Sequence, residues 1–409
     1  MESTAPASSA PSASPASTAS VSWTWTPNLT STLWLAAVPL AVGGMIGVIV
    51  SRRVYNAEGK KRPEEMLALQ TTAKGKIEVC RVPVPTPKRG EVLIKMSHAP
   101  VNPSDIYCAM DRSKLSTEPT YPHGIGYEGS GVVVGSGGGL LGYWAMLRKW
   151  RVSTRDLAGD GKFWAEYAVA KPSNTPPLPD SVDLREGCLA NVNPLTALSM
   201  LIIAQEEGHK ALVHTAASST LGLQLLRAAP AFGIKIVAVV RGEKNARMLR
   251  QTMKHPADLV VRTDVANFKS DLKRAVRSTE ATLAFDAIGG DVARAVYGAM
   301  PEKARVYTYG NLSGEGMPKE LGDKKNDAQK PYSYYLVGPW LIAGGLRRLF
   351  KVSRYQFSML PHELASSVDR EISMDDPALI DLLYAYADHQ KSGKVIMRMP
   401  HKSDGRAGL

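Results

Sequence analysis

The chain has 409 residues, of which 44% are hydrophobic and 22% are charged. This globular composition excludes disorder of the whole chain, and the length allows two or three domains with their own cores. The formal net charge of +12 would suit nucleic acid or an anionic surface. The Lys and Arg residues are scattered through helix-like segments without a nucleic-acid-binding motif, so we expect no nucleic-acid partner.

Residues 1–31 are rich in Ala, Ser, Pro and Thr and carry one charge, Glu2. Such a segment buries too little apolar surface to offset its ordering entropy, which predicts a disordered tail. Residues 33–50, "LWLAAVPLAVGGMIGVIV", are uncharged and mostly apolar, and their length is close to the ~20 residues of a bilayer-crossing helix. We therefore predict a single transmembrane anchor at 32–52 and a linker at 53–65.

Basic residues follow this apolar segment, as "SRR" and "KKR", and none precedes it. By the positive-inside rule the catalytic part would face the cytoplasm or the mitochondrial matrix. A buried core helix and a targeting segment are the alternatives, although the basic start of a signal peptide and the Arg content of a transit peptide are both missing.

Residues 66–191 contain short alternating strands broken by Pro and Gly, which predicts a β-rich, barrel-like unit. Residues 192–339 alternate between strand-like and helix-like segments. This alternation predicts parallel strands with right-handed crossovers, a doubly wound sheet, and hence an α/β fold class. Residues 340–400 end in the strand-like "GKVIMRMP" and are expected to pack back on the first unit.

Three cysteines occur, Cys80, Cys108 and Cys188, and none has another Cys or His at metal-ligand spacing. We therefore expect neither a disulfide framework nor a structural zinc site, and a reducing compartment is the simpler interpretation. The stretch 334–354 is apolar and then basic, and too short for a span. We interpret it as a wall of a substrate pocket, with a membrane-facing patch as the alternative.

The turn in "HTAASSTLG" (214–222) lies between a predicted strand and a predicted helix. It keeps only the last glycine of the dinucleotide-binding pattern G-x-G-x-x-G, but every pattern position is small, and the helix N-terminus offers N–H groups to a phosphate. An ordinary turn that binds nothing is the alternative. The six pattern positions are Ala217, Ser218, Ser219, Thr220, Leu221 and Gly222.

The second predicted strand ends in Arg241, about 20 positions past the turn, where an acid would bind the ribose of NAD and a base the 2′-phosphate of NADP. Lys244 and Arg247 follow, and the first acid is Glu243. A guanidinium can hold a phosphate bidentately, so we predict NADPH as the cofactor. A solvated Arg at a strand end is the alternative.

An ordered set of motifs resembles the medium-chain dehydrogenase/reductase superfamily, and within it the zinc-independent quinone oxidoreductases and mitochondrial-type 2-enoyl thioester reductases. The resemblance covers about residues 66–400 and implies a GroES-like catalytic domain around a Rossmann NADPH domain. The motifs are "APVNPSDI" (99–106), "GYEGSGVVV" (126–134), "FWAEYAV" (163–169), "NPLTAL" (193–198), "HTAASSTLG" (214–222), "VVR" (239–241), "FDAIGG" (285–290) and "YTYGNLSG" (307–314).

By this resemblance, Asn102 and Tyr127 stand where zinc-dependent members carry a Cys and a His ligand. An amide and a neutral phenol are not usual zinc ligands, so we expect no catalytic metal. The nearby His123 is interpreted as a surface or turn residue.

The resemblance also implies roles for individual residues. Asn193 and Thr196 would lie near the nicotinamide, Tyr309 and Gly310 would approach the cofactor through backbone and stacking contacts, and Ser218 to Leu221 would bring N–H groups to the pyrophosphate. We expect Asn102, Tyr107 and Thr196 to be the catalytic residues.

Tyr107 is the best candidate for the proton donor, with an aromatic side chain that only fills the domain cleft as the alternative. The enoyl thioester reductases carry a catalytic Tyr at the position of Ser113. This mismatch counts more against thioester reduction than against quinone reduction, because a quinone can take its second proton from water.

The expected function is therefore zinc-independent hydride transfer from NADPH to a quinone or an α,β-unsaturated carbonyl or enoyl thioester compound. A hydrophobic small molecule would be the substrate, and the resemblance suggests a homodimer. The alternative is a membrane-anchored NADPH-binding sensor or scaffold without turnover.

Overall fold

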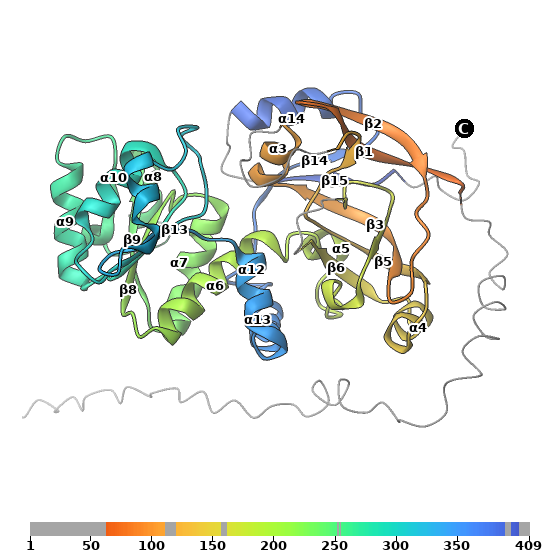
Figure 1. Cartoon of the computed structure of the whole chain (residues 1–409), viewed down its shortest axis with the longest axis horizontal. Coiled ribbons are helices and arrows are strands. Elements are labelled where there is room, and N and C mark those ends of the chain that lie inside the picture. Colours follow the sequence, from red (N-terminus) through yellow and green to blue (C-terminus); the bar gives the residue numbers. More distant parts are fainter. Residues whose placement is uncertain are drawn as a thin grey trace, which may run out of the picture. The chain divides into compact units, whose positions relative to one another are not determined.

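The computed structural model describes residues 63–110, 120–156, 162–251, 253, 255–388 and 394–400 (Figure 1). All of them belong to one compact unit, residues 60–409. The tail predicted at 1–31, the anchor predicted at 32–52 and Ser113 lie outside the described residues.

The first part of the described chain is built mostly from antiparallel strands, and β14 and β15 form a parallel pair. Three of them form a sheet in the order β2-β1-β4, from β1 (Glu65–Ala73), β2 (Lys76–Pro83) and β4 (His123–Gly124). The second sheet has the order β14-β15-β3-β5-β6, with β7 also paired to β3. Its strands are β3 (Val92–Val101), β5 (Glu128–Ser136), β6 (Arg151–Arg155), β7 (Tyr167–Ala170), β14 (Val368–Ser373) and β15 (Lys394–Arg398).

The last described strand completes this second sheet. β15 runs antiparallel to β3, with Val395 opposite Val101, so the end of the chain returns to its first part. The apolar side chains of β3 and β15 share one buried core with the indole of Trp164. The short helices of this part are α3 (Pro103–Ala109), α4 (Leu140–Leu147), α5 (Leu184–Gly187) and α14 (Leu379–Asp388).

The second part is a six-stranded sheet in the order β10-β9-β8-β11-β12-β13, and every neighbouring pair is parallel. Its strands are β8 (Ala211–Thr215), β9 (Lys235–Val240), β10 (Val260–Arg262), β11 (Leu283–Asp286), β12 (Arg305–Thr308) and β13 (Tyr332–Tyr334). The strands are short and mostly buried, as expected for a parallel sheet covered on both faces.

Helices cover both faces of this sheet (Figure 1). α6 and α7 share a core with Leu212 and Phe285, whereas α9 and α10 pack on the opposite face with Val213 and Ala284. The helices are α6 (Val192–Glu206), α7 (Thr220–Phe232), α8 (Glu243–Gln251), α9 (Phe268–Thr279), α10 (Gly290–Ala299), α11 (Lys319–Gly322), α12 (Val337–Ala343) and α13 (Gly345–Met359).

The strand order reverses between β8 and β11, because the chain runs outward from β8 to β10 and then returns to the other side of β8. In open α/β sheets the carboxyl ends of the strands at such a switch point are where ligands bind. The predicted α/β class with a Rossmann-like parallel sheet is therefore confirmed.

The membrane expectation needs correction. No helix in the described ranges is long and apolar enough to cross a bilayer. The predicted localisation, a single-pass membrane protein with its catalytic domain facing the cytoplasm or the mitochondrial matrix, is therefore wrong by this finding. The length and hydropathy of residues 32–52 suggested the anchor, and these residues lie outside the described ranges.

The segment interpreted as a pocket wall, 334–354, forms most of α12 and α13. Leu341 and Val352 are buried against the core under α6, whereas Ile342, Leu346 and Phe350 are exposed. The segment thus contributes one apolar face to the core and leaves another uncovered in the described chain.

Gly126 gives a test of the packing in the first part. Its φ is +98°, and a Cβ there would lie 2.3 Å from Cδ1 of Trp164, which is buried and donates from Nε1 to Pro100 O at 3.0 Å. We predict that Gly126→Ala loses at least about 2 kcal/mol more unfolding free energy than Gly75→Ala, because overpacking adds to the backbone strain. Gly75 also has a positive φ, +71°, but nothing lies within 4 Å of its added Cβ. Equal losses in urea unfolding would show that the Trp164 contact is unimportant.

Candidate functional site

The turn after β8 is tight and capped. Ala216 has a φ of +51°, and the N–H of the buried Ala217 donates to Val239 O at 3.1 Å, which ties the turn to β9. Ser219 is the N-cap of α7, and its Oγ accepts from Gly222 N at 3.1 Å. The structure thus brings the predicted small-residue stretch to the start of a helix at the sheet's switch point.

Gly222 is required by this packing. A Cβ at this position would lie 2.5 Å from Ala217 O and 2.6 Å from Ala217 C, both backbone atoms. The last glycine of the dinucleotide pattern serves the same need, close approach of the helix to the turn. Ser218, Ser219 and Thr220 are partly exposed on the turn, whereas Leu221 is buried.

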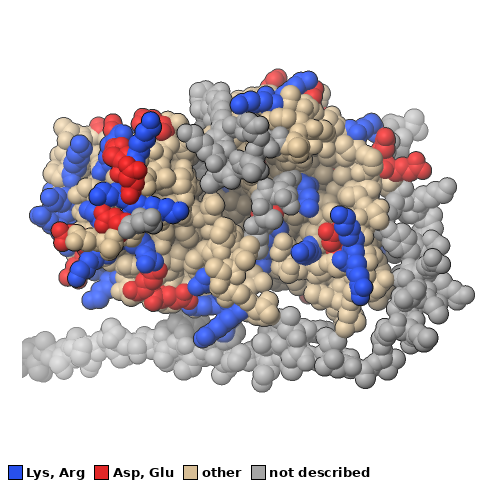
Figure 2. All heavy atoms as spheres, in the orientation of Figure 1, with Lys and Arg blue, Asp and Glu red and all other residues tan. Residues whose placement is uncertain are grey.

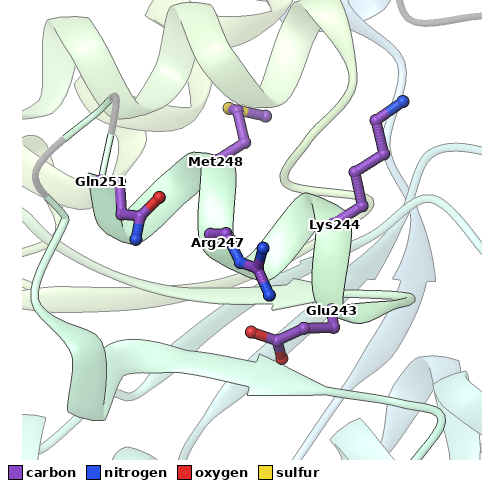
Figure 3. A pocket seen from close by; sticks show the side chains of 5 residues that line it. All are labelled: Glu243, Lys244, Arg247, Met248 and Gln251. Carbon is purple, nitrogen blue, oxygen red and sulfur yellow. The ribbon is translucent and has the colours of Figure 1, made fainter.

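Basic side chains follow β9 beside the turn. Thr215 of β8 is opposite Val239 of β9, so Arg241 begins the segment that leaves the sheet next to the turn. Arg241, Lys244 and Arg247 are all exposed. Lys244 and Arg247 extend from α8, where they line a shallow pocket with Glu243, Met248 and Gln251 (Figure 3).

The acids near these cations are engaged elsewhere. Glu243 accepts from Arg262 at 2.8 Å and lies 3.5 Å from Arg250. Asp264 binds Arg262 at 2.7 Å, and this ion pair, with a hydrogen bond from Gly242 N, lowers the pKa of Asp264. Within the described ranges, no ion pair joins a carboxylate to Arg241, Lys244 or Arg247. Basic side chains gather over the elements labelled α8 and α9, interspersed with acidic ones (Figure 2).

On the other side of the turn, a buried carboxylate organises the end of β11. Asp286 accepts from Thr215 Oγ1 at 2.7 Å, from Gly289 N at 2.8 Å and from Ile288 N at 3.2 Å. Burial raises the pKa of Asp286, and these hydrogen bonds oppose the shift. The loop that they hold is the "DAIGG" stretch at the carboxyl end of the sheet.

Tyr309 and Gly310 follow β12 and meet that loop. A Cβ on Gly310 would lie 2.7 Å from Ala287 O, so the two loops interlock closely. The hydroxyl of Tyr309 lies 2.8 Å from Nε2 of His214, and the two rings stack at 5.8 Å between centroids. The phenol is therefore engaged within the protein, and the backbone and the ring carry any contact to a ligand.

Asn193 and Thr196 lie in the first two turns of α6. Asn193 is partly exposed, whereas Thr196 is buried and its Oγ1 donates to Val192 O at 2.6 Å. The start of α6 is held by a carboxylate of the first part: Glu128 Oε2 accepts from Asn191 N at 3.0 Å and from Val192 N at 2.9 Å.

Asn102 lies next to the same carboxylate. It is buried, it is the N-cap of α3, and its Nδ2 donates to Glu128 Oε1 at 2.9 Å. Its Oδ1 accepts from Lys394 Nζ. Both ends of the amide are therefore engaged within the protein, and its predicted catalytic role stays a prediction.

Tyr107 lies on α3 and is partly exposed. The neighbouring Cys108 accepts a hydrogen bond at 2.7 Å from the hydroxyl of Tyr127, whose pKa is raised by burial. The buried Asp105 accepts from Asn102 N at 2.8 Å and from Tyr127 N at 2.9 Å, and burial raises its pKa to about 7. Tyr107 and Tyr127 thus flank the corner formed by α3 and the start of β5.

Sequence reasoning missed two charged residues of this corner, Glu128 and Lys394. Both are buried, in the segments "GYEGSGVVV" and "GKVIMRM". A charge next to small or apolar strand residues was the available signal, because charged side chains are rarely buried unless paired. His123 lies on β4, opposite Thr71, and is partly exposed. The described residues contain no group of three His, Cys, Asp or Glu that could hold a metal.

Together these features define a class: an α/β domain with a dinucleotide-type βα turn, joined to a β-rich lobe. Residues 88–180 match the family described as alcohol dehydrogenase GroES-like domain. The mitochondrial enoyl-[acyl-carrier-protein] reductase of Arabidopsis thaliana is 28% identical over 229 residues, which cover 55% of this chain and 59% of that protein. The human quinone oxidoreductase is 30% identical over 176 residues, which cover 42% of this chain and 51% of that protein.

The matches thus span about half the length of these curated relatives. Solved structures extend the likeness. The crystal structure of a putative NADPH:quinone reductase from Mesorhizobium loti covers 83% of this chain and 100% of its own, with a TM-score of 0.72 and 26% identity. A mycobacterial protein complexed with NADPH covers 81% of this chain and 99% of its own, with a TM-score of 0.64 and 20% identity.

The family match, the relatives and the fold agree. They support the resemblance to the medium-chain dehydrogenase/reductase superfamily that the sequence motifs predicted.

The pH dependence of stability tests whether His214, on β8 before the turn, is buried in its neutral form. Burial lowers its pKa to about 3, so the unfolded chain binds more protons than the folded chain between pH 3 and about 6.5. The neutral imidazole therefore contributes its full stabilisation above about pH 6.5, and this contribution is lost as the pH falls toward 3. Between pH 7 and pH 5, the unfolding free energy of the wild type is expected to fall by about 2 kcal/mol more than that of His214→Gln, whose side chain does not titrate. Parallel curves for the two proteins in urea unfolding would contradict the burial of a neutral His214.

Proposed function

We propose that the protein is an NADPH-dependent oxidoreductase that reduces a hydrophobic quinone or an α,β-unsaturated carbonyl compound without a catalytic metal. The observation that carries this proposal is the set of exposed cations after β9, Arg241, Lys244 and Arg247, beside a capped turn whose last glycine cannot be replaced. The first acid after the strand, Glu243, is engaged by Arg262 and Arg250. Cations in this position suit a 2′-phosphate.

The residues present fit the cofactor along the carboxyl ends of the strands. Ser218, Ser219 and Thr220 would hold the pyrophosphate at the N-terminus of α7. Asn193 and the backbone of Tyr309 and Gly310 would border the nicotinamide, with Thr196 holding the first turn of α6. When bound, NADPH supplies the hydride.

Relatives support the same class of chemistry. The curated matches are named enoyl-[acyl-carrier-protein] reductase and quinone oxidoreductase, and one structural neighbour was solved with NADPH. All three names describe enzymes or a cofactor complex, and none favours the alternative of a sensor or scaffold without turnover.

The donor set argues for a reaction without a metal ligand at the corner of α3 and β5. The amide of Asn102 is bound to Glu128 and to the ammonium of Lys394, so a metal ion there would have to displace a cation that is already buried. A neutral phenol at Tyr127 would be a poor replacement for an imidazole ligand.

For the proton that follows hydride transfer, we keep Tyr107 as the donor. Its partly exposed position on α3 allows contact with a substrate in a way that the buried Asn102 does not. An enone needs this proton on carbon, whereas a reduced quinone can take it from water. A homodimer stays a prediction, which sedimentation velocity of the purified chain would test.

Arg241→Ala tests the cofactor assignment. Loss of a charge-assisted phosphate contact is expected to weaken NADPH binding by about tenfold to hundredfold and to leave NADH binding nearly unchanged. Arg274→Ala serves as the control, because Arg274 is an exposed Arg on α9 paired with Asp271 at 2.7 Å. Equal losses for NADPH and NADH in titration calorimetry would remove the 2′-phosphate role.

Tyr107→Phe tests the proton donor. Across a panel of quinones, enones and enoyl thioesters, we expect kcat for enones to fall about a hundredfold or more, whereas quinone reduction changes little. Tyr143→Phe, on α4, is the matched control. If enone and quinone rates fell equally, Tyr107 would be a packing residue, and if the wild type oxidised no NADPH with any compound, the proposed activity would be abandoned.

A further inference from the structure

Lys394 is a buried cation at the first residue of the last described strand. Only 4% of it is exposed, and its Nζ donates to Asn102 Oδ1. The antiparallel register of β15 and β3, with Val395 opposite Val101, places it next to Asn102 although 292 positions separate the two residues in the chain. No part of the cofactor site described above uses this lysine.

From Asn102 the contacts continue into the second part of the chain. Asn102 Nδ2 donates to Glu128 Oε1, and Glu128 Oε2 accepts from the N–H groups of Asn191 and Val192. These N–H groups belong to the start of α6, where a helix has donors without partners of its own and favours a negative charge. Val192 O in turn accepts from Thr196 Oγ1. A continuous polar network therefore runs from β15 to the second turn of α6.

Among the residues that the structure describes, no other side chain caps the start of α6. Its N-cap, Asn191, makes no capping hydrogen bond: its Oδ1 accepts instead from Gln356 Nε2 at 3.2 Å, and its Nδ2 donates to Ser153 Oγ at 2.5 Å and to Thr154 O at 2.8 Å. Gln356 adds a bond from Nε2 to Ala190 O at 2.6 Å, which holds the chain before the helix. The carboxylate of Glu128 is therefore the group that fixes the first turn.

The charge of Lys394 balances the carboxylates around it. Glu128 and Asp105 both face it and favour its charged form, against the burial that lowers its pKa, and the thiol of Cys188 is the third titratable neighbour. Two buried carboxylates without this ammonium would lack a compensating charge, which strongly disfavours their ionised and correctly hydrogen-bonded state.

We propose that Lys394 is a positioning residue, which, through Asn102 and Glu128, fixes the first turn of α6 and with it Asn193 and Thr196 relative to the β-rich lobe. This inference rests on the proposed function for its consequence, since there Asn193 borders the nicotinamide and Thr196 holds the helix turn that carries it. Lys394 itself does not contact the reacting atoms. It acts on turnover by holding the geometry in which they meet.

The test compares Lys394→Met and Asn102→Ala with Lys330→Met. Lys330 is a partly buried control lysine that donates to Tyr297 O at 3.2 Å and to Met300 O at 3.0 Å, outside the network. Hydrogen–deuterium exchange in the full chain reports on the amides of residues 191–196, and steady-state kinetics separates kcat from KM. The Asn102 variant keeps the buried ammonium, so it can be measured even if Lys394→Met does not fold.

Both network variants are expected to exchange the amides of 191–196 at least about tenfold faster than the wild type. They should lower kcat by about tenfold or more, with the KM for NADPH nearly unchanged, because the phosphate contacts lie elsewhere. Lys394→Arg, which keeps the charge and a donor, should recover part of kcat. Lys330→Met should show neither effect.

Unchanged exchange in Asn102→Ala, or equal changes in Lys330→Met, would overturn the inference. A KM for NADPH that rises as much as kcat falls would also overturn it, because cofactor binding would then depend on the network as much as turnover does. If the wild type oxidises no NADPH, the proposed function fails, and the exchange measurement still decides whether the network holds α6.

Discussion

The burial of the Glu128 carboxylate constrains the rest of the structure. A buried carboxylate is costly unless donors and an opposite charge surround it. Here the donors come from the start of α6 and from Asn102, and the opposite charge comes from Lys394 on the last strand. The chain can satisfy this group only when the β-rich lobe, the first helix of the Rossmann-like part and the end of the chain meet at one corner.

That corner adjoins the part of the fold where chemistry would take place. α6 leads from it into the second part, and the turn after β8 packs closely because Gly222 has no Cβ. The exposed cations after β9 lie next to that turn, and the acids around them are engaged with other arginines. The site thus combines a rigid join between two lobes with an accessible positive surface, an arrangement suited to a phosphate-bearing cofactor.

The sequence predicted the fold class well because strand and helix alternation is a local pattern, and the motifs in order indicated the superfamily. It also identified the turn despite the loss of two glycines, since strand, small residues and helix follow in the right order. The role of Asn102 was different. Its amide binds a lysine 292 positions away, and no local pattern reports a contact of this kind.

The predicted anchor shows another limit of sequence patterns. Residues 33–50 satisfy a length and hydropathy rule, which measures only the composition of a segment and not its surroundings. Buried charges such as Glu128 and Lys394 show a second limit of sequence patterns, which concerns contacts rather than composition. A strand pattern marks them as exceptions but does not identify their partners, because those partners come from other elements of the fold.

The most direct measurement is titration calorimetry of the purified protein with NADPH and with NADH, together with its metal content. Tight binding of NADPH, at least about tenfold tighter than NADH, with no stoichiometric zinc, is the expected result. Absence of NADPH binding, equal affinity for both nucleotides, or one zinc ion per chain would contradict the proposed cofactor site.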